Sequence, residues 1–172
     1  MTVVFRYGHR IVRDKRLTSH VFLVARAFLI KSGFYCGEKD QKLEDSIRKV
    51  GFELEYCENC IEKLLELKNE GKKIVHLTMY GEPILKKIEE IKNEKEKLVI
   101  IVGSKKVQKE IYEIADYNIS ITYEPHSEVG ALAIFLNEIF ESKALLDQLK
   151  DKEAEEKAKK ILRNKINKVR IK

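Results

Sequence analysis

Two short and almost wholly apolar runs constrain the fold of this chain more than any other feature. They are IVHL at 74–77 and LVIIVG at 98–103. Continuous apolar runs of this length are typical of central strands in a parallel sheet whose two faces are both covered. The sequence therefore predicts an α/β fold built on such a sheet.

The rest of the chain alternates in the same way, with β-branched or aromatic runs followed by helical patterns. A basic loop is predicted at 9–17, and the next helix is expected to begin at Thr18 or Ser19 and to stop at Gly33. This order indicates βαβ units, and hence a mostly parallel sheet with helices on both faces. The predicted strands are 2–8, 34–36, 52–57, 72–79, 97–103 and 118–123, and the predicted helices are 18–33, 39–50, 58–70, 82–94, 105–115, a long one from about 126, and a polar, lysine-rich one at the end.

Ligands of such sheets bind beyond the carboxyl ends of the strands, which selects four loops, 8–17, 79–83, 103–107 and 122–128. Gly81 and Gly103 permit a close backbone approach in two of them. Neither loop has a Walker or dinucleotide-binding spacing, so nothing supports ATP or NAD. Each loop alone is more often a plain connection, but together they make a nucleotide-like pocket plausible.

Charge is unevenly placed along the chain. Residues 1–31 hold seven basic residues against the single acid Asp14, a net charge of +6 that equals the charge of the whole chain. The last 16 residues hold eight more basic residues and no acid, so the segment between the two ends is net acidic. Basic ends beside an acidic body favour a polyanionic partner such as nucleic acid, although a solvated helix would also explain the basic tail.

Other features exclude whole classes of protein. The sequence has no run of 18 apolar residues and no apolar signal segment, so a cytoplasmic protein without membrane attachment is expected. Its three cysteines do not make a disulfide framework, and Cys57-x-x-Cys60 lacks the second ligand pair of a zinc site. The four histidines have no metal-ligand spacing, so no metal is expected. His76 is interpreted as a buried, hydrogen-bonded residue.

Four blocks then give a specific pattern: YGHRIVRDKRLTSHVFLVARAF (7–28), VHLTMYG (75–81), VIIVGSKKV (99–107) and IYEIADYNISITYEPHSEVGALA (111–133). Together they resemble the archaeal tRNA (cytidine-56) 2′-O-methyltransferases of the SPOUT superfamily. The resemblance implies a deep trefoil knot in the C-terminal part of the sheet, S-adenosyl-L-methionine as methyl donor, S-adenosyl-L-homocysteine as product, tRNA as substrate and a homodimer. It also implies a methyltransferase domain at 1–146, with the knot roughly at 75–140, and a basic C-terminal extension at 147–172.

The resemblance implies that the cofactor lies in the loops at 77–81, 103–107 and 121–129, three of the places that the strand-end rule selects. Leu77, Met79 and Val107 would form an apolar slot for adenine, and backbone amides of 103–105 and 127–129 would hold the ribose and carboxylate. Ser127 would cap the helix that follows. The cofactor-binding residues predicted in this way are Leu77, Thr78, Met79, Gly81, Gly103, Ser104, Lys105, Lys106, Val107, Ile121, Thr122, Glu124, Pro125, His126, Ser127, Glu128 and Val129.

The implied reaction needs a group that stabilises a ribose alkoxide and a group that accepts its proton. Arginine stays protonated, so it suits the first role and can also hold a phosphate. Arg13 and Arg16 are the first candidates, followed by Arg10. His20 or His9 is a candidate proton acceptor, and solvent or a substrate phosphate would also serve. The predicted tRNA-binding residues are His9, Arg10, Arg13, Lys15, Arg16 and Arg26.

The sequence also departs from the pattern of these enzymes at Gln108 and at residues 122–124. The SPOUT motif of an Asn followed by a catalytic Arg is not cleanly present, although His20 and Arg26 have its spacing. These departures leave one alternative open, a non-catalytic RNA-binding domain with a SPOUT-like fold.

Overall fold

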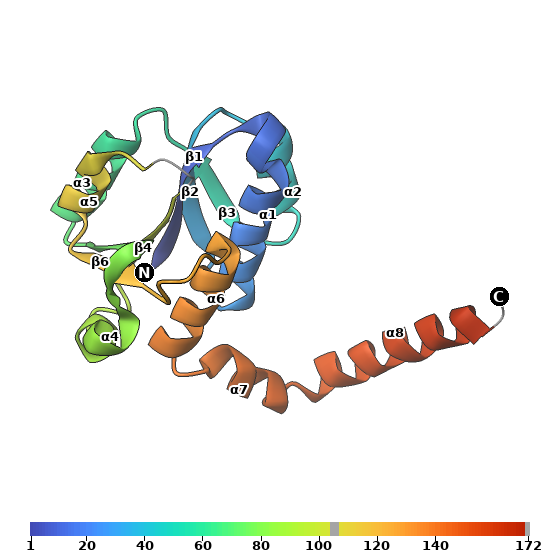
Figure 1. Ribbon diagram of the computed structural model, residues 1–172. Coiled ribbons are helices and arrows are strands. Elements are labelled where there is room, and N and C mark those ends of the chain that lie inside the picture. Colours follow the sequence, from blue (N-terminus) through green and yellow to red (C-terminus); the bar gives the residue numbers. More distant parts are fainter. Residues whose placement is uncertain (104–106, 171–172) are drawn as a thin grey trace.

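The chain folds around a single six-stranded sheet (Figure 1). The computed structural model describes residues 1–103 and 107–170, apart from the side chains of Lys15 and residues 164–170. The strands are β1 (Val3–His9), β2 (Ser32–Gly37), β3 (Glu53–Tyr56), β4 (Lys73–Pro83), β5 (Leu98–Val102) and β6 (Tyr117–Ser120). The helices are α1 (Ile11–Ala27), α2 (Gln41–Arg48), α3 (Cys60–Asn69), α4 (Ile84–Lys92), α5 (Lys109–Ile114), α6 (Glu128–Ile139), α7 (Lys143–Lys150) and α8 (Lys152–Arg170).

The strand order is β3-β2-β1-β5-β4-β6, and every neighbouring pair is parallel. The predicted α/β fold with a mostly parallel sheet is thus confirmed. β5 is fully buried between β1 and β4, as its apolar run predicts. This order brings the carboxyl ends of β4, β5 and β6 to one edge of the sheet.

Alternate side chains of the central strands feed two separate hydrophobic cores. On one face Val4, Ile100 and Val102 pack with residues of α1, α2, α4 and α6. On the other face Phe5 and Ile101 pack with residues of α3 and α5. Helices therefore cover both faces, as predicted.

The basic segment after β1 is helical, and its prediction as a loop is wrong. Gly8, one residue before the end of β1, has a φ of 76°, and α1 begins at Ile11 with Arg10 in the N-cap position. The Glu38 carboxylate accepts a hydrogen bond from the Ile11 amide at 2.7 Å and takes the place of a local cap. Because this cap comes from 27 residues away, local sequence could not show where the helix begins.

The predicted ends of this helix are also wrong. Thr18 is buried inside α1 and is no cap. Gly33 lies within β2, where an added Cβ would stand 2.3 Å from the Val4 carbonyl oxygen. The chain leaves the helix instead through Leu29, which has a φ of 74°.

β4 and β6 pair in two stretches. Leu77 and Glu82 both face Ile119, so residues 78–81 stand outside the ladder between them. Gly81 returns the chain against the backbone of Asn118, where an added Cβ would be 2.4 Å from the carbonyl oxygen. The strand order and this insertion agree with a SPOUT fold, and the knot itself stays a prediction.

The chain ends in two helices where one was predicted. Asp151 separates them and caps α8 by accepting a hydrogen bond from the Ala154 amide at 2.9 Å. In Figure 1, α8 extends away from the body of the molecule. The predicted polar C-terminal helix is therefore present. No helix of the described residues is long and apolar enough to cross a membrane.

One disulfide joins Cys36 of β2 to Cys60 at the start of α3, across a sequence separation of 24. Cys57 stays free, and burial raises the pKa of its thiol to about 11. Disulfide pairing cannot be deduced from cysteine spacing alone. The three cysteines were expected to make no disulfide framework, and this single bond was not foreseen from the sequence, although Cys57 and Cys60 do lie where β3 passes into α3.

We expect Cys60→Ser to lower the free energy of unfolding by about 3 kcal/mol, because the open chain regains the entropy of a loop of this size. Thermal unfolding with and without reductant measures this loss, and Cys57→Ser is the matched control that keeps the bond. The denatured, unreduced protein should show one reactive thiol per chain. Three thiols before reduction would contradict the disulfide.

Candidate functional site

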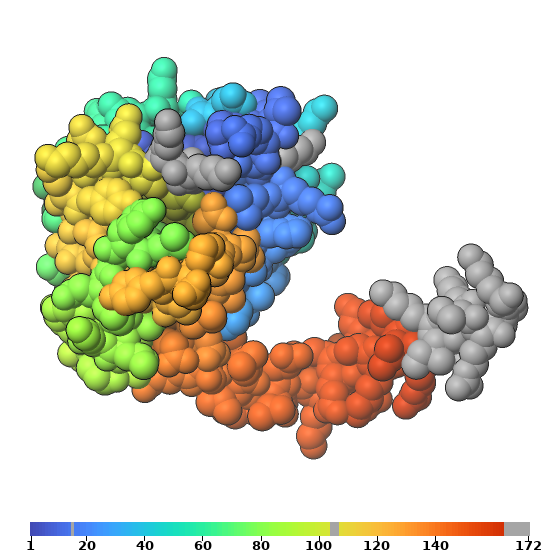
Figure 2. Space-filling view, in the orientation of Figure 1, coloured from blue at the N-terminus to red at the C-terminus, as the bar shows by residue number. Residues whose placement is uncertain are grey.

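A cavity of about 260 Å³ opens at the edge of the sheet where β4, β5 and β6 end. Part of its wall is the start of α6. In Figure 2 the segment at the end of β4 (green) lies beside the chain that leads into α6 (orange) on the front of the body. The lining residues are His76, Leu77, Thr78, Met79, Tyr80, Val102, Gly103, Val107, Tyr112, Ile119, Ile121, His126, Glu128 and Ala131.

The structure brings together eight of the residues predicted from sequence to bind a cofactor. They come from all three predicted loops and are Leu77, Thr78, Met79, Gly103, Val107, Ile121, His126 and Glu128. Six others do not line the cavity, namely Gly81, Thr122, Glu124, Pro125, Ser127 and Val129. Ser104, Lys105 and Lys106 lie outside the described residues.

Two glycines keep the cavity in shape. Gly103 lines it, and an added Cβ there would stand 2.4 Å from a methyl group of Val107. Gly81 lies off the lining and acts through the backbone contact with Asn118. Gly103 therefore leaves room for a ligand or for the Val107 side chain beside the backbone. Gly81 allows the backbone of β4 to lie close to that of β6.

The start of α6 has the predicted cap. The Ser127 hydroxyl accepts a hydrogen bond from the Gly130 amide at 3.0 Å. Ala131, one turn into the helix, is buried and lines the cavity. A capped helix start beside a cavity offers free amides and a positive partial charge to an acceptor.

His76 is buried, as predicted, and it also lines the cavity, which the sequence did not indicate. Its Nδ1 lies 2.9 Å from Oδ1 of Asn118, whose amide nitrogen donates to the Tyr112 carbonyl at 2.9 Å. Asn118 Oδ1 is thus the acceptor and His76 Nδ1 the donor. Burial lowers the pKa of His76, so the ring is neutral, with Nε2 free to accept. The other lining residues that sequence reasoning missed are Tyr80, Val102, Tyr112, Ile119 and Ala131.

Arg6 was also missed as a site residue. It is fully buried, and its Nη1 donates to the Gly103 carbonyl at 2.5 Å and to the Val102 carbonyl at 3.4 Å. Burial lowers the pKa of Arg6, and the negative charge of Glu128 opposes that shift. An arginine inside the apolar strand VVFRYG was the only signal for this role in the sequence.

The predicted catalytic arginines share the first turns of α1, where Arg13 and Arg16 are exposed. Arg10 pairs with Asp14 at 2.8 Å, and this bond holds the pKa of the Asp14 carboxyl below its usual value. His20 is exposed one turn further on. None of these residues lines the cavity.

Arg26 lies apart from this group. It is exposed in the last turn of α1, with its guanidinium beside Gly51 at the turn before β3. The structure therefore does not bring Arg26 together with the other predicted tRNA-binding residues. The side chain of Lys15 lies outside the described part of the chain.

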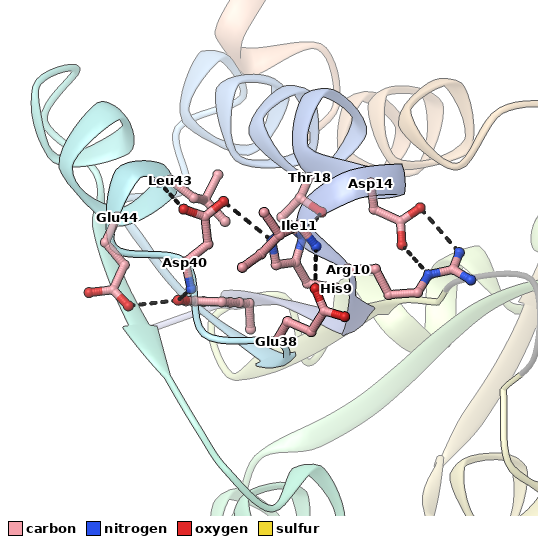
Figure 3. Close-up of polar contacts among 10 residues, drawn as sticks. His9, Arg10, Ile11, Asp14, Thr18, Glu38, Asp40, Leu43 and Glu44 are labelled. Carbon is pink, nitrogen blue, oxygen red and sulfur yellow. Dashed lines mark hydrogen bonds and ion pairs between the residues drawn. The ribbon is translucent and has the colours of Figure 1, made fainter.

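His9 is fully buried, so its prediction as a tRNA contact is wrong. Figure 3 shows it between α1 and the loop before α2. Its Nδ1 lies 2.9 Å from the Thr18 hydroxyl and its Nε2 lies 3.6 Å from the Asp40 carboxylate. Asp40 in turn caps α2 through the Leu43 amide. The histidine thus joins β1, α1 and α2 and supports the shape of the arginine-bearing turns.

The arrangement has two chemical parts. The cavity offers apolar and aromatic walls, backbone groups and one carboxylate, Glu128, which suits a small ligand with a ring system and a positive charge. The turns of α1 offer exposed guanidinium groups, which suit phosphates. Among the described residues, no group of three or more His, Cys, Asp or Glu could hold a metal ion.

The family whose model matches is described as tRNA ribose 2′-O-methyltransferase, aTrm56, and the match covers residues 50–168. A relative from Pyrococcus horikoshii, a tRNA (cytidine(56)-2′-O)-methyltransferase, is 43% identical over 156 residues, covering 87% of this chain and 77% of the relative. A protein of the same name from Thermococcus kodakarensis is 40% identical over 174 residues, covering 94% and 97%.

Solved structures show the same fold at low identity. The A. aeolicus TrmH/SpoU tRNA modifying enzyme has a TM-score of 0.64 at 22% identity, covering 83% of this chain and 75% of that one. The SpoU methyltransferase AviRb from Streptomyces viridochromogenes, in complex with AdoMet, has a TM-score of 0.62 at 12% identity, covering 83% and 60%.

The buried His76 should make stability depend on pH. Its pKa is lowered in the fold, so the unfolded chain binds the proton first as pH falls. The contribution of neutral His76 to the free energy of unfolding should therefore be fully present above about pH 6.5 and should be lost progressively below that pH. This residue alone should give a slope of up to about 1.4 kcal/mol per pH unit.

Urea unfolding between pH 8 and 5 measures this slope. The variant His76→Gln should lose less stability than the unchanged protein below about pH 6.5, and the two curves should run parallel above pH 7.5. Equal slopes at low pH would show that His76 is not a buried neutral group.

Proposed function

The chain belongs to the tRNA ribose 2′-O-methyltransferase family, aTrm56, and from this membership we propose that it methylates the ribose 2′-hydroxyl of cytidine-56 in the T loop of tRNA. S-adenosyl-L-methionine is the methyl donor and S-adenosyl-L-homocysteine the product. The observation that carries the proposal is the cavity, because residues of three predicted cofactor loops meet in it.

The residues present fit this cofactor. Leu77, Met79 and Val107 give the cavity an apolar wall for adenine, and Gly103 leaves its backbone open to a ligand. The start of α6, capped by Ser127, points its free amides toward an acceptor. Glu128 places a negative charge beside a cationic ligand. The bound cofactor supplies a methyl group on a positively charged sulfur.

The arginines of α1 serve the ribose and its phosphates. Arg13 and Arg16 are exposed, so their guanidinium groups are free to hold a phosphate and to stabilise an alkoxide. Arg10 is partly engaged by Asp14 and is the weaker candidate. Arginine stays protonated, so the exposed His20 is the side chain proposed to accept the proton.

The proposal includes a homodimer. Among the side chains that the structure describes, none from the arginine-bearing turns of α1 lines the cavity of the same chain. A second copy that brings its own α1 to the cavity would complete the site. We assign the activity to residues 1–146, with residues 75–140 threaded as a knot and 147–172 as an appended basic helix, and we place the protein in the cytoplasm with its tRNA.

The departures from the family pattern do not touch the cavity. Gln108 is exposed at the start of α5, and Thr122 and Glu124 are exposed beside Ile121, which does line the cavity. Their side chains are therefore not required as walls. This placement supports a cofactor-binding enzyme over a non-catalytic RNA-binding domain.

We expect the purified protein to transfer label from S-adenosyl-L-methionine to a T-loop transcript at the 2′-oxygen of cytidine-56, read at single-nucleotide resolution. A transcript that already carries a 2′-O-methyl group there is the matched control and should take up no label. Label on a base or on another nucleotide would contradict the substrate. No detectable heat with millimolar S-adenosyl-L-homocysteine in calorimetry would favour the non-catalytic alternative.

Arg13→Ala and Arg16→Ala should show which arginine stabilises the alkoxide and which one binds a phosphate. Loss of the group that stabilises the alkoxide should lower kcat about a hundredfold or more. Loss of a phosphate contact should mainly raise the KM for tRNA and reduce the salt slope of binding by about one.

Arg48→Ala, in an exposed pair with Asp45 on α2, is the matched control and should change neither quantity. If both α1 variants behave like this control, the arginine turns are not the substrate site.

A further inference from the structure

Arg6 is a buried cation that neither the fold nor the reaction as described so far requires. It is the largest fully buried side chain among the residues that the structure describes, and it lies in β1 opposite Val102 of β5. Alternation along β1 puts it on the same face as Val4, which packs with residues of α1 and α6. Its guanidinium therefore lies on the helix-covered face, at the end of the sheet where the cavity opens.

The contacts of Arg6 lead to the cavity. Nη1 donates to the carbonyl of Gly103, a lining residue where the chain leaves β5. Nε and Nη2 are buried and have no hydrogen-bond partner among the described residues. A charged group with two unmet donors costs several kcal/mol, and a well-packed apolar residue at such a position is often as stable or more so. Fold stability alone gives no reason for an arginine here.

The charges around Arg6 connect it to both halves of the site. The acid with the largest effect on it is Glu128, which lines the cavity at the start of α6. Asp14 of α1 acts in the same direction, and Arg10 acts against it. The charge of Arg6 is therefore affected both by the carboxylate at the cavity and by the Arg10–Asp14 ion pair at the start of α1.

Resting on the proposed function, we propose that Arg6 is a positioning residue of the cofactor site. Its guanidinium holds the Gly103 carbonyl at the end of β5, and its buried positive charge favours the ionised Glu128 carboxylate that lines the cavity, which suits a cationic cofactor. Arg6 touches neither the ribose nor the methyl group. Its removal should act on cofactor binding and leave the affinity for tRNA unchanged.

The test begins with calorimetry of S-adenosyl-L-homocysteine binding to the unchanged protein, together with the KM values for cofactor and for tRNA. Arg6→Gln should weaken cofactor binding by about tenfold to a hundredfold, the loss expected for a charged hydrogen bond. Arg6→Lys keeps the charge and one donor and should recover part of that loss. The KM for tRNA should stay within about twofold in both variants.

Arg48→Gln is the matched control, because it removes an arginine from an exposed ion pair and should leave cofactor binding unchanged. A folded Arg6→Gln variant with unchanged cofactor affinity and an unchanged KM for cofactor would overturn the proposal. A variant in which only the KM for tRNA changes would also overturn the proposal. Failure of the unchanged protein to bind the product would overturn the proposed function as well, which distinguishes the two failures.

A double-mutant cycle tests the part that Glu128 plays. Glu128→Gln should weaken cofactor binding in the unchanged background and should have a smaller effect in the Arg6→Gln background. Additive losses would show that Arg6 does not act through Glu128 and would overturn that part of the proposal.

A measurement without substitution covers the case in which Arg6 variants do not fold. The side-chain Nε–H resonance of Arg6, followed by NMR in the unchanged protein, should shift on saturation with S-adenosyl-L-homocysteine. An unmoved resonance while binding is complete would overturn the proposal.

Discussion

The insertion of β5 between β1 and β4 is the contact on which the rest of the structure depends. Its five residues are all buried, and both of its edges are paired in parallel. This pairing sets Val102 opposite Arg6 on one side and Leu77 on the other. The cavity, Gly103 and the buried arginine meet at the same edge of the sheet because Arg6 and Leu77 flank Val102, the last residue of β5.

The protein uses arginine in two physically different ways. Arg13 and Arg16 are exposed on the first turns of α1, where water solvates their charge until an anion binds in its place. Arg6 is withdrawn from water and relies on carbonyl groups and on the charge of Glu128. Exposed guanidinium groups suit a large anionic substrate, and the buried one suits the fixed geometry of a small pocket. The exposed arginines are supported from a distance, since Glu38 and His9 hold the first turns of α1 in place.

Much of the architecture could be predicted from the sequence because it depends on local patterns. Apolar runs marked β4 and β5, and the quoted blocks indicated the family and the loops of the cavity. The start of α1 could not be predicted, because its cap, Glu38, is distant in sequence. The burial of His9 depends on its contacts with Thr18 and Asp40, which lie in other elements. The disulfide depends on the packing of the start of α3 beside β2. The roles of Arg6 and His76 could not be predicted for a related reason. The role of a polar residue in an apolar strand depends on the residues that contact it in the folded structure.

The sequence by itself determined the class of fold, the order of the elements and the family, because hydrophobic periodicity and short motifs are properties of adjacent residues. Only the tertiary structure decided which residues of the three loops face the cavity and which, like Thr122 and Glu124, face water. It also decided that one arginine is buried behind Gly103 while others stand on a helix that the sequence had suggested to be a loop. Burial, charge environment and distant caps arise from contacts between segments far apart in the chain, and no local pattern contains them.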